Sequence, residues 1–272
     1  MTFNFPQNAH DFLVMLVPML TFALGFAFLF FPGRLLRFMG LEPIGGKPEA
    51  IGEGRSSFAG ALLALALGCL LLQDPIALQP GLNLMLAIGW SISTFGRLLQ
   101  LTFDGGLKRK RIQTRFLIAF GLAVMAWSVT EIPYMSCVEN AASECTLPGS
   151  LKDWFLFLVA ILTFGLGLIA LLLPRLALRI LKLQTRINMP YAVGETRGTL
   201  AGFYMAIGGV YLLMPQPVDF VALVLGGAWL LTGLGRALSV LFDRGWTVYN
   251  MFGVLFEVGI GVLTIGFVLR LY

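Results

Sequence analysis

The chain has 272 residues, of which 58% are hydrophobic and 12% are charged, and its mean hydropathy is +0.86. This composition lies far outside the range of soluble domains and indicates an integral membrane protein. The formal net charge of +5 does not indicate nucleic-acid binding, because the basic residues flank apolar runs, where membrane orientation accounts for them. The only histidine is His10, so a multi-histidine metal or haem site within one chain is excluded and no cofactor is expected.

Eight apolar runs follow a short polar segment, residues 1–11, which lacks the pattern of a removed signal peptide. A run of about twenty residues, rising about 1.5 Å per residue as a helix, crosses a hydrocarbon core of roughly 30 Å. The sequence therefore predicts an all-α protein with eight transmembrane helices. The runs are 12–31, 56–72, 82–101, 116–132, 154–173, 199–214, 220–241 and 248–269.

The basic residues fall on one side of these predicted spans. Of the 19 Lys and Arg residues, all but Lys152 and Arg270 lie in alternate loops or at the helix ends beside those loops. Cytoplasmic loops carry such an excess, so this side is predicted to be cytoplasmic and both termini to face outward.

The sequence also contains an internal duplication. Gly-Glu-Gly-Arg at residues 52–55 is restated as Gly-Glu-Thr-Arg at residues 194–197, 142 positions later. Gly96-Arg97 and Asp104 are restated 139 positions later as Gly235-Arg236 and Asp243. The predicted units are residues 1–132 and 153–272, each a four-helix repeat, joined by a periplasmic linker at residues 133–152.

Each repeat is predicted to include a short interfacial helix after its first span. In residues 175–183, Arg175, Arg179 and Lys182 are spaced at i, i+4 and i+7 between aliphatic residues, a pattern typical of an amphipathic helix in the headgroup region. Residues 33–41 are the first copy of this segment. Because four spans is an even number, the two repeats enter the membrane from the same side and are parallel.

The duplicated charges lie at the cytoplasmic boundary of the predicted helices. One interpretation is a salt-bridged clamp within each copy that ties its second helix to its third, because charges near a membrane must be paired or reach the interface. The other is a site for an anionic headgroup or small anion, since Arg favours bidentate contact with phosphate or carboxylate. The residues are Glu53, Arg55, Arg97 and Asp104 in the first copy, and Glu195, Arg197, Arg236 and Asp243 in the second.

Glu257 breaks the duplication, because its counterpart at the offset of 139 is the apolar Ile118. It lies nine positions into the last apolar run, roughly 13 Å deep by helical rise. A carboxylate at that depth is expected to be protonated, to pair with a residue such as Arg236, or to face an aqueous cavity. Glu257 is therefore the candidate intramembrane functional residue, and a structural hydrogen bond to a neighbouring helix is the alternative.

Two of the three cysteines, Cys137 and Cys145, lie close together in the predicted outward linker. An oxidising periplasm permits a disulfide between them, and two free thiols are the alternative. Cys69 falls within the second apolar run and is expected to be a small buried hydrophobe.

The segments from Gly96-Arg97 to Asp104-Gly105, and from Gly235-Arg236 to Gly245, resemble an uncharacterised bacterial family of four-helix membrane proteins, a domain of unknown function with DoxX-like topology. The resemblance implies that the chain is a fused tandem pair of family units. A bacterial protein of this kind is expected in the inner (plasma) membrane, where the loop charges place both termini in the periplasm. It implies no known activity and no catalytic residue.

Three functions are compatible with these observations. The first is a non-catalytic scaffold or accessory subunit of a membrane complex, which the short loops and the scarcity of charge inside the helices favour. The second is a permease for small solutes or lipids with Glu257 as its proton-linked residue. The third is a membrane enzyme acting on a lipophilic substrate, with Glu257 as general acid or base. The expected partners are the bilayer, anionic headgroups at the cytoplasmic face and other membrane subunits.

Overall fold

The computed structural model describes residues 9–47, 49–71, 79–103, 110–130, 148–213, 219–243 and 245–271. We call residues 9–130 the first half and residues 148–271 the second half. The first half contains α1 (Ala9–Phe30), α2 (Pro32–Met39), β1 (Leu41–Pro43), η1 (Ile44–Gly46), α3 (Glu49–Leu71), α4 (Gln79–Phe103) and α5 (Lys110–Ser128). The second half contains α7 (Leu151–Leu172), α8 (Pro174–Ile180), β2 (Leu183–Thr185), η3 (Pro190–Ala192), α9 (Val193–Glu195), η4 (Thr196–Leu200), α10 (Ala201–Leu213), α11 (Asp219–Phe242) and α12 (Val248–Val268).

Six of the described helices are long and apolar enough to cross a membrane. These spans are Ala9–Phe30, Ala50–Leu71, Gly81–Phe103, Leu151–Leu172, Asp219–Phe242 and Val248–Val268. Large apolar side chains are exposed on the outside of the molecule, including Phe252 and Leu255 of α12, each 70% exposed. Such a surface is unfavourable in water but suits contact with lipid tails. The protein is therefore a multi-pass, membrane-embedded helical protein.

Two of the eight expected spans are not among these six. The expected span at 116–132 falls on α5, which carries Lys110, Arg111 and Arg115 in its first two turns. The expected span at 199–214 falls on α10, which has only 13 residues and follows the π-helical turn η4. The basic residues shorten the apolar part of α5. The change from π-helix to α-helix divides the apolar run at 199–214 between η4 and α10.

The elements of the two halves follow one another in the same order. α7, α8 and β2 each begin 142 residues after α1, α2 and β1. Both α2 and α8 start with a proline at the first helical position, Pro32 and Pro174. Proline is favoured there because its missing N–H would have no partner in the first turn. The sequence thus marks the same break after the first long helix of each half.

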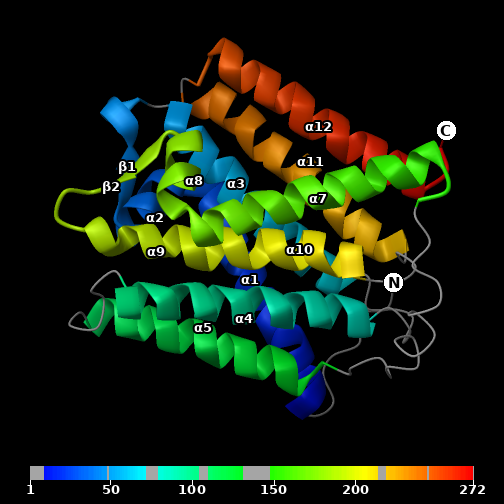
Figure 1. Ribbon diagram of the computed structural model, residues 1–272, viewed down its shortest axis with the longest axis horizontal. Helices are drawn as coiled ribbons and strands as arrows, with labels where there is room; N and C mark the ends of the chain where they lie inside the picture. Colours follow the sequence, from blue (N-terminus) through cyan, green and yellow to red (C-terminus); the bar gives the residue numbers. More distant parts are fainter. Residues whose placement is uncertain are drawn as a thin grey trace.

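The long helices of the two halves pack in two groups of four, and each group contains helices from both halves. α3 packs against α1 and α11, and α11 packs against α12; we call these four helices quartet A. α10 packs against α7 and α4, and α4 packs against α5; these four form quartet B. In Figure 1, α4 and α5 lie along one side of the molecule beside α10, and α11 and α12 lie along the opposite side. Each quartet therefore combines two long helices of the first half with two of the second.

Small residues allow helices of different halves to approach closely. A Cβ atom added at Gly60 of α3 would lie 2.7 Å from the backbone nitrogen of Thr232 in α11. At the matching place in quartet B, a Cβ at Gly202 of α10 would lie 2.5 Å from the carbonyl oxygen of Gly89 in α4. Small residues at such contacts bring helix backbones together where the surrounding lipid provides no hydrophobic drive.

A two-stranded antiparallel ribbon joins the halves beyond α2 and α8. In it, Leu41 of β1 is opposite Thr185 of β2, and Pro43 is opposite Leu183. The amide of Arg186 donates to the carbonyl of Gly40 at 2.9 Å and extends the pairing. The sequence did not predict these strands, because three residues are too few to show a period of two.

A tryptophan in each half hydrogen-bonds from one quartet to the other. The indole of Trp90 on α4 donates to the hydroxyl of Thr21 on α1 at 3.1 Å. The indole of Trp229 on α11 donates to the hydroxyl of Thr163 on α7 at 2.9 Å. Each bond joins two helices of the same half that belong to different quartets. Tryptophan hydrogen bonds therefore hold together the helices of one half, and the mixed quartets hold the two halves to each other.

Candidate functional site

The buried charges of quartet A meet around Arg236, which is 6% exposed on α11. Its Nη1 and Nη2 atoms donate to both carboxylate oxygens of Glu53 on α3, the second at 2.9 Å. Its Nε and Nη2 atoms donate to the two oxygens of Glu257 on α12, at 2.9 and 2.6 Å. Nη1 also lies 3.4 Å from the amide oxygen of Asn250. We call Glu53, Arg236 and Glu257 the Arg236 cluster.

This geometry uses the full donor capacity of the guanidinium. An arginine side chain carries five N–H donors in a planar fork, and the Arg236 cluster with Asn250 supplies an acceptor for each of them. A buried charge without such partners would be strongly destabilising. Counted with both carboxylates in their charged form, one guanidinium and two carboxylates give the cluster a formal charge of −1.

The buried charges of quartet B show the inverse arrangement. Glu195, 2% exposed in α9, accepts from Arg97 of α4 at 3.3 Å and from Arg115 of α5. Arg97 also donates to the hydroxyl of Thr199 at 3.2 Å. The guanidinium of Arg115 lies 4.4 Å from the centre of the Phe38 ring, close enough for a cation–π contact. We call Arg97, Arg115 and Glu195 the Glu195 cluster, and its formal charge is +1.

A third ion pair fixes the end of α11 to α3. Arg55 donates to Asp243 through Nη2 at 2.9 Å and through Nε at 3.2 Å. The same side chain also donates through Nη1 to the carbonyl of Leu29 at the end of α1. In the second half, Arg197 donates through Nε to the carbonyl of Leu171 at 3.3 Å, the corresponding position on α7.

The duplicated charges form ion pairs, but these pairs join different helices from those expected. The sequence suggested that each copy ties its second helix to its third. The structure instead pairs Glu53 with Arg236 of α11, Arg55 with Asp243 just after α11, and Arg97 with Glu195 in the other half. The two halves carry similar charged residues, so pairing within a half and pairing between halves would use the same residue types and sequence alone could not distinguish them. Asp104, the remaining member of the predicted sets, lies outside the described residues.

Of the three environments proposed for Glu257, the structure shows the pairing with Arg236, at 2.6 Å. The comparison with Ile118 needs correction by one position. Residues 250, 257, 261 and 264 of α12 are buried, and so are residues 112, 119, 123 and 126 of α5, an offset of 138. Ile118 is 57% exposed, whereas Ala119 is 1% exposed. Glu257 therefore corresponds in packing to Ala119, which has no ionisable group.

The same offset explains how the two clusters acquire opposite charge. Arg115 of α5 corresponds to Gly253 of α12, where an added Cβ would lie 2.6 Å from Cδ of Arg236. α5 thus contributes the cation Arg115 and, four residues later, the uncharged Ala119. α12 contributes Gly253, which has no side chain, and, four residues later, the carboxylate of Glu257. Sequence analysis had assigned Arg115 only to membrane orientation, although its place at the start of an apolar run pointed to a helix-end role.

Two further predictions concern the cysteines. Cys137 and Cys145 lie outside the described residues, so their disulfide stays a prediction. Cys69 is buried in α3, with 5% exposure, and its sulfur lies 3.6 Å from the carbonyl oxygen of Leu82. This surrounding is that of a small apolar residue, as expected. Among the described residues, no group of three or more His, Cys, Asp or Glu side chains could hold a metal ion.

The fold and the buried clusters define the class of the protein: a multi-pass helical membrane protein whose buried charges are arranged as ion-pair clusters between its halves. A DUF4345 domain, a domain of unknown function, covers residues 151–268, from the start of α7 to the end of α12. The match includes Glu195, Arg236 and Glu257 and leaves the first half uncovered. No curated protein and no solved structure is significantly similar to the chain.

Proposed function

We propose that this protein is a non-catalytic scaffold or accessory subunit of a membrane complex. The observation that carries the proposal is the Arg236 cluster, in which Glu257 accepts two hydrogen bonds from a guanidinium that Glu53 also binds. A carboxylate held in this way stabilises a helix contact and is poorly suited to exchanging protons. Glu257, the candidate intramembrane functional residue, thus has a structural role in this proposal.

We further infer a topology for the chain in the membrane. The matching order of elements in the two halves supports eight spans in two parallel repeats, with α5 and α10 as the shorter spans and α2 and α8 as interfacial helices. Arg34 and Arg37 of α2, like Arg175 and Arg179 of α8, are exposed and suited to anionic lipid headgroups. The positive-inside rule then places both termini in the periplasm of a bacterial inner membrane. A tandem pair of DoxX-like units is the corresponding evolutionary interpretation.

The two alternative functions make different demands on Glu257. A proton-linked permease needs this carboxylate to gain and lose a proton during each cycle, which would break its contacts with Arg236. A membrane enzyme needs a substrate beside the carboxylate and a second group to complete proton transfer. The ion pairs of Glu257 oppose both demands, because protonation would leave the buried Arg236 with weaker acceptors.

Native mass spectrometry of protein extracted in mild detergent tests the proposal. We expect a protein partner bound at fixed stoichiometry, and we expect the same complex with the Glu257→Gln variant. This substitution keeps an amide oxygen that can accept from Nε of Arg236 and removes the charge. The proposal would be overturned by proton-coupled solute uptake into vesicles that the wild type supports and Glu257→Gln abolishes, with folding of the variant verified by gel filtration.

A further inference from the structure

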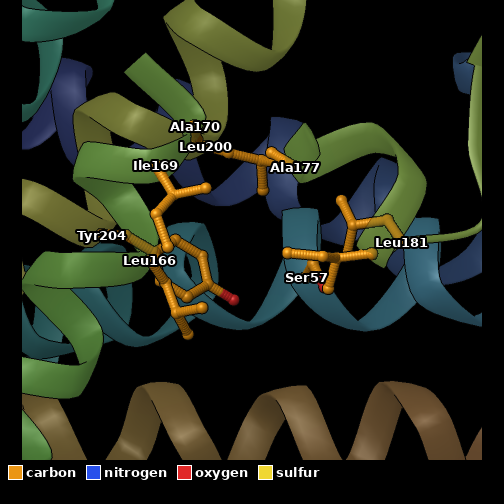
Figure 2. A pocket seen from close by; sticks show the side chains of 9 residues that line it. Ser57, Leu166, Ile169, Ala170, Ala177, Leu181, Leu200 and Tyr204 are labelled. Carbon is orange, nitrogen blue, oxygen red and sulfur yellow. The ribbon is translucent and has the colours of Figure 1, made fainter. Parts of the chain in front are cut away.

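A small cavity of about 70 Å³ lies between α7, α8 and α10 of the second half, with Ser57 of α3 on one wall. Most of its lining is aliphatic, with Leu166, Ile169 and Ala170 from α7, Ala177 from α8, and Leu181 just after α8. In Figure 2 Leu166 and Ile169 lie beside the ring of Tyr204, Ala177 and Leu181 lie across the cavity, and the hydroxyl of Tyr204 points toward Ser57 of α3. The cavity is thus apolar at its sides and carries hydroxyl groups on one wall.

The hydroxyl of Tyr204 occupies a polar position at the edge of the Arg236 cluster. It is in hydrogen-bonding relation with the side chains of Ser57 and Thr232, and it lies close enough to Glu257 and Arg236 to interact electrostatically with both. A tyrosine placed in this way presents its ring to apolar groups and its oxygen to a polar one. The cavity therefore combines apolar walls with one hydrogen-bonding oxygen within reach of a guest.

The first half fills the corresponding space with its own side chains. At the offset of 142, Ala170 corresponds to Phe28 and Leu200 corresponds to Phe58. Those two rings stack with their centres 4.9 Å apart, and they are 2% and 1% exposed. Tyr204 corresponds to Leu62, which is 1% exposed. The first half thus has a packed aromatic core where the second half has a cavity and a hydroxyl. Helix packing alone does not require the cavity, because the same chain fills the corresponding space in its first half with two phenylalanines.

We propose that this cavity binds one end of a lipophilic molecule from the bilayer, a chain-like amphiphile bearing a hydroxyl or carbonyl oxygen. The exposed neighbours Leu176 and Ile180 of α8, and Leu172 at the end of α7, continue the apolar surface outward. A guest can therefore place its terminal atoms in the cavity and leave the rest of its chain among lipid tails. Its oxygen would bond to Tyr204, the group that the first half lacks.

Photolabelling in phosphatidylcholine vesicles tests this proposal. The probe is hexadecan-1-ol carrying a diazirine beside its hydroxyl, and the matched probe is the same chain without the hydroxyl. Peptide mass spectrometry locates the label. We expect the alcohol to label residues of α7, α8 and α10 around the cavity in preference to the exposed outer face of α12.

Two sets of variants sharpen the test. Ala170→Phe with Leu200→Phe copies the first half and should reduce labelling at the cavity about tenfold, equivalent to a loss of roughly 1.4 kcal/mol of binding. Tyr204→Phe should reduce labelling by the alcohol about fivefold, the size expected for one net hydrogen bond, and leave labelling by the hydrocarbon probe unchanged. Leu263→Phe, on the exposed face of α12, is the matched control.

The proposal fails if the wild type shows no enrichment of label at the cavity, or if the double phenylalanine variant is labelled there as strongly as the wild type. Should the double variant not fold, Ala177→Leu replaces it, because Leu35 occupies the corresponding place in the first half. A partner protein found by native mass spectrometry has no bearing on these outcomes, so this inference and the accessory-subunit proposal can fail separately.

Discussion

The Arg236 and Glu195 clusters both bury charged side chains between the two halves, but with opposite arrangements of charge. Each joins a helix of one half to a helix of the other at the same level of its quartet, and each has a central charge held by two opposite charges. In quartet A the third helix contributes a carboxylate, and in quartet B it contributes a guanidinium. The two clusters thus share a Glu–Arg pair between the halves and differ in the charge of the third member.

The largest expected effect comes from removing a central charge. Arg236→Met leaves Glu53 and Glu257 buried without their partner and should lower the free energy of unfolding by about 3–5 kcal/mol. Glu195→Gln should cost less, because the side chain of Arg115 is 12% exposed and can reach the interface more readily. Thermal unfolding in mild detergent measures both. The triple variant Arg236→Met, Glu53→Gln, Glu257→Gln is the control and should recover much of the loss, and equal losses for the two central charges would contradict the difference in burial.

A smaller effect should follow from filling the space that the third helix leaves open. Gly253→Ala places a Cβ atom 2.6 Å from Cδ of Arg236 and should cost about 1–3 kcal/mol, the usual range for overpacking. Gly259→Ala on the same helix is the matched control, because an added Cβ there meets nothing within 4 Å. Unfolding midpoints of the two variants should differ. If they are the same, Gly253 does not make room for Arg236.

The smallest effect concerns a feature that both halves share. Trp90→Phe and Trp229→Phe each remove one indole hydrogen bond to a threonine, and each should cost about 0.5–1.5 kcal/mol. The two losses should be alike, because Thr21 and Thr163 both still donate to a carbonyl on their own helix. Denaturant titrations measure both losses. Trp127→Phe is the comparison, because it removes an indole hydrogen bond to Ser91 at an exposed site, where the loss should be smaller.

Much of the fold could be predicted from the sequence, because hydropathy reports helices directly. The run predicted at 12–31 is α1 (Ala9–Phe30), and the run at 248–269 is α12 (Val248–Val268). The buried charges were recognisable only in part. Arg236 and Glu257 fall inside predicted apolar runs, where charged residues are rare, whereas Glu53 was expected before the run at 56–72 and lies within α3 (Glu49–Leu71).

The partners of those charges could not be predicted in the same way. The pairing of helices from different halves depends on which surfaces fit, such as the contact of Gly60 with Thr232, and two similar copies offer two sets of similar surfaces. The one-residue slip between α5 and α12 was hidden as well, because only burial distinguishes Ala119 from Ile118 as the counterpart of Glu257. The cavity beside Tyr204 arises from the absence of side-chain volume, which hydropathy does not record.

The mixed quartets also have a consequence for biosynthesis. A ribosome completes α4 and α5 well before α10, the helix against which α4 packs in quartet B. Until the second half is inserted, the Arg97 and Arg115 side chains have no Glu195 to meet, and Glu53 has no Arg236. Neither quartet can close while the chain is half made, so these charges of the first half stay without their partners until the second half is complete. Conversely, if the chain is cut between the halves, the two fragments should stay associated, because each quartet contains helices from both.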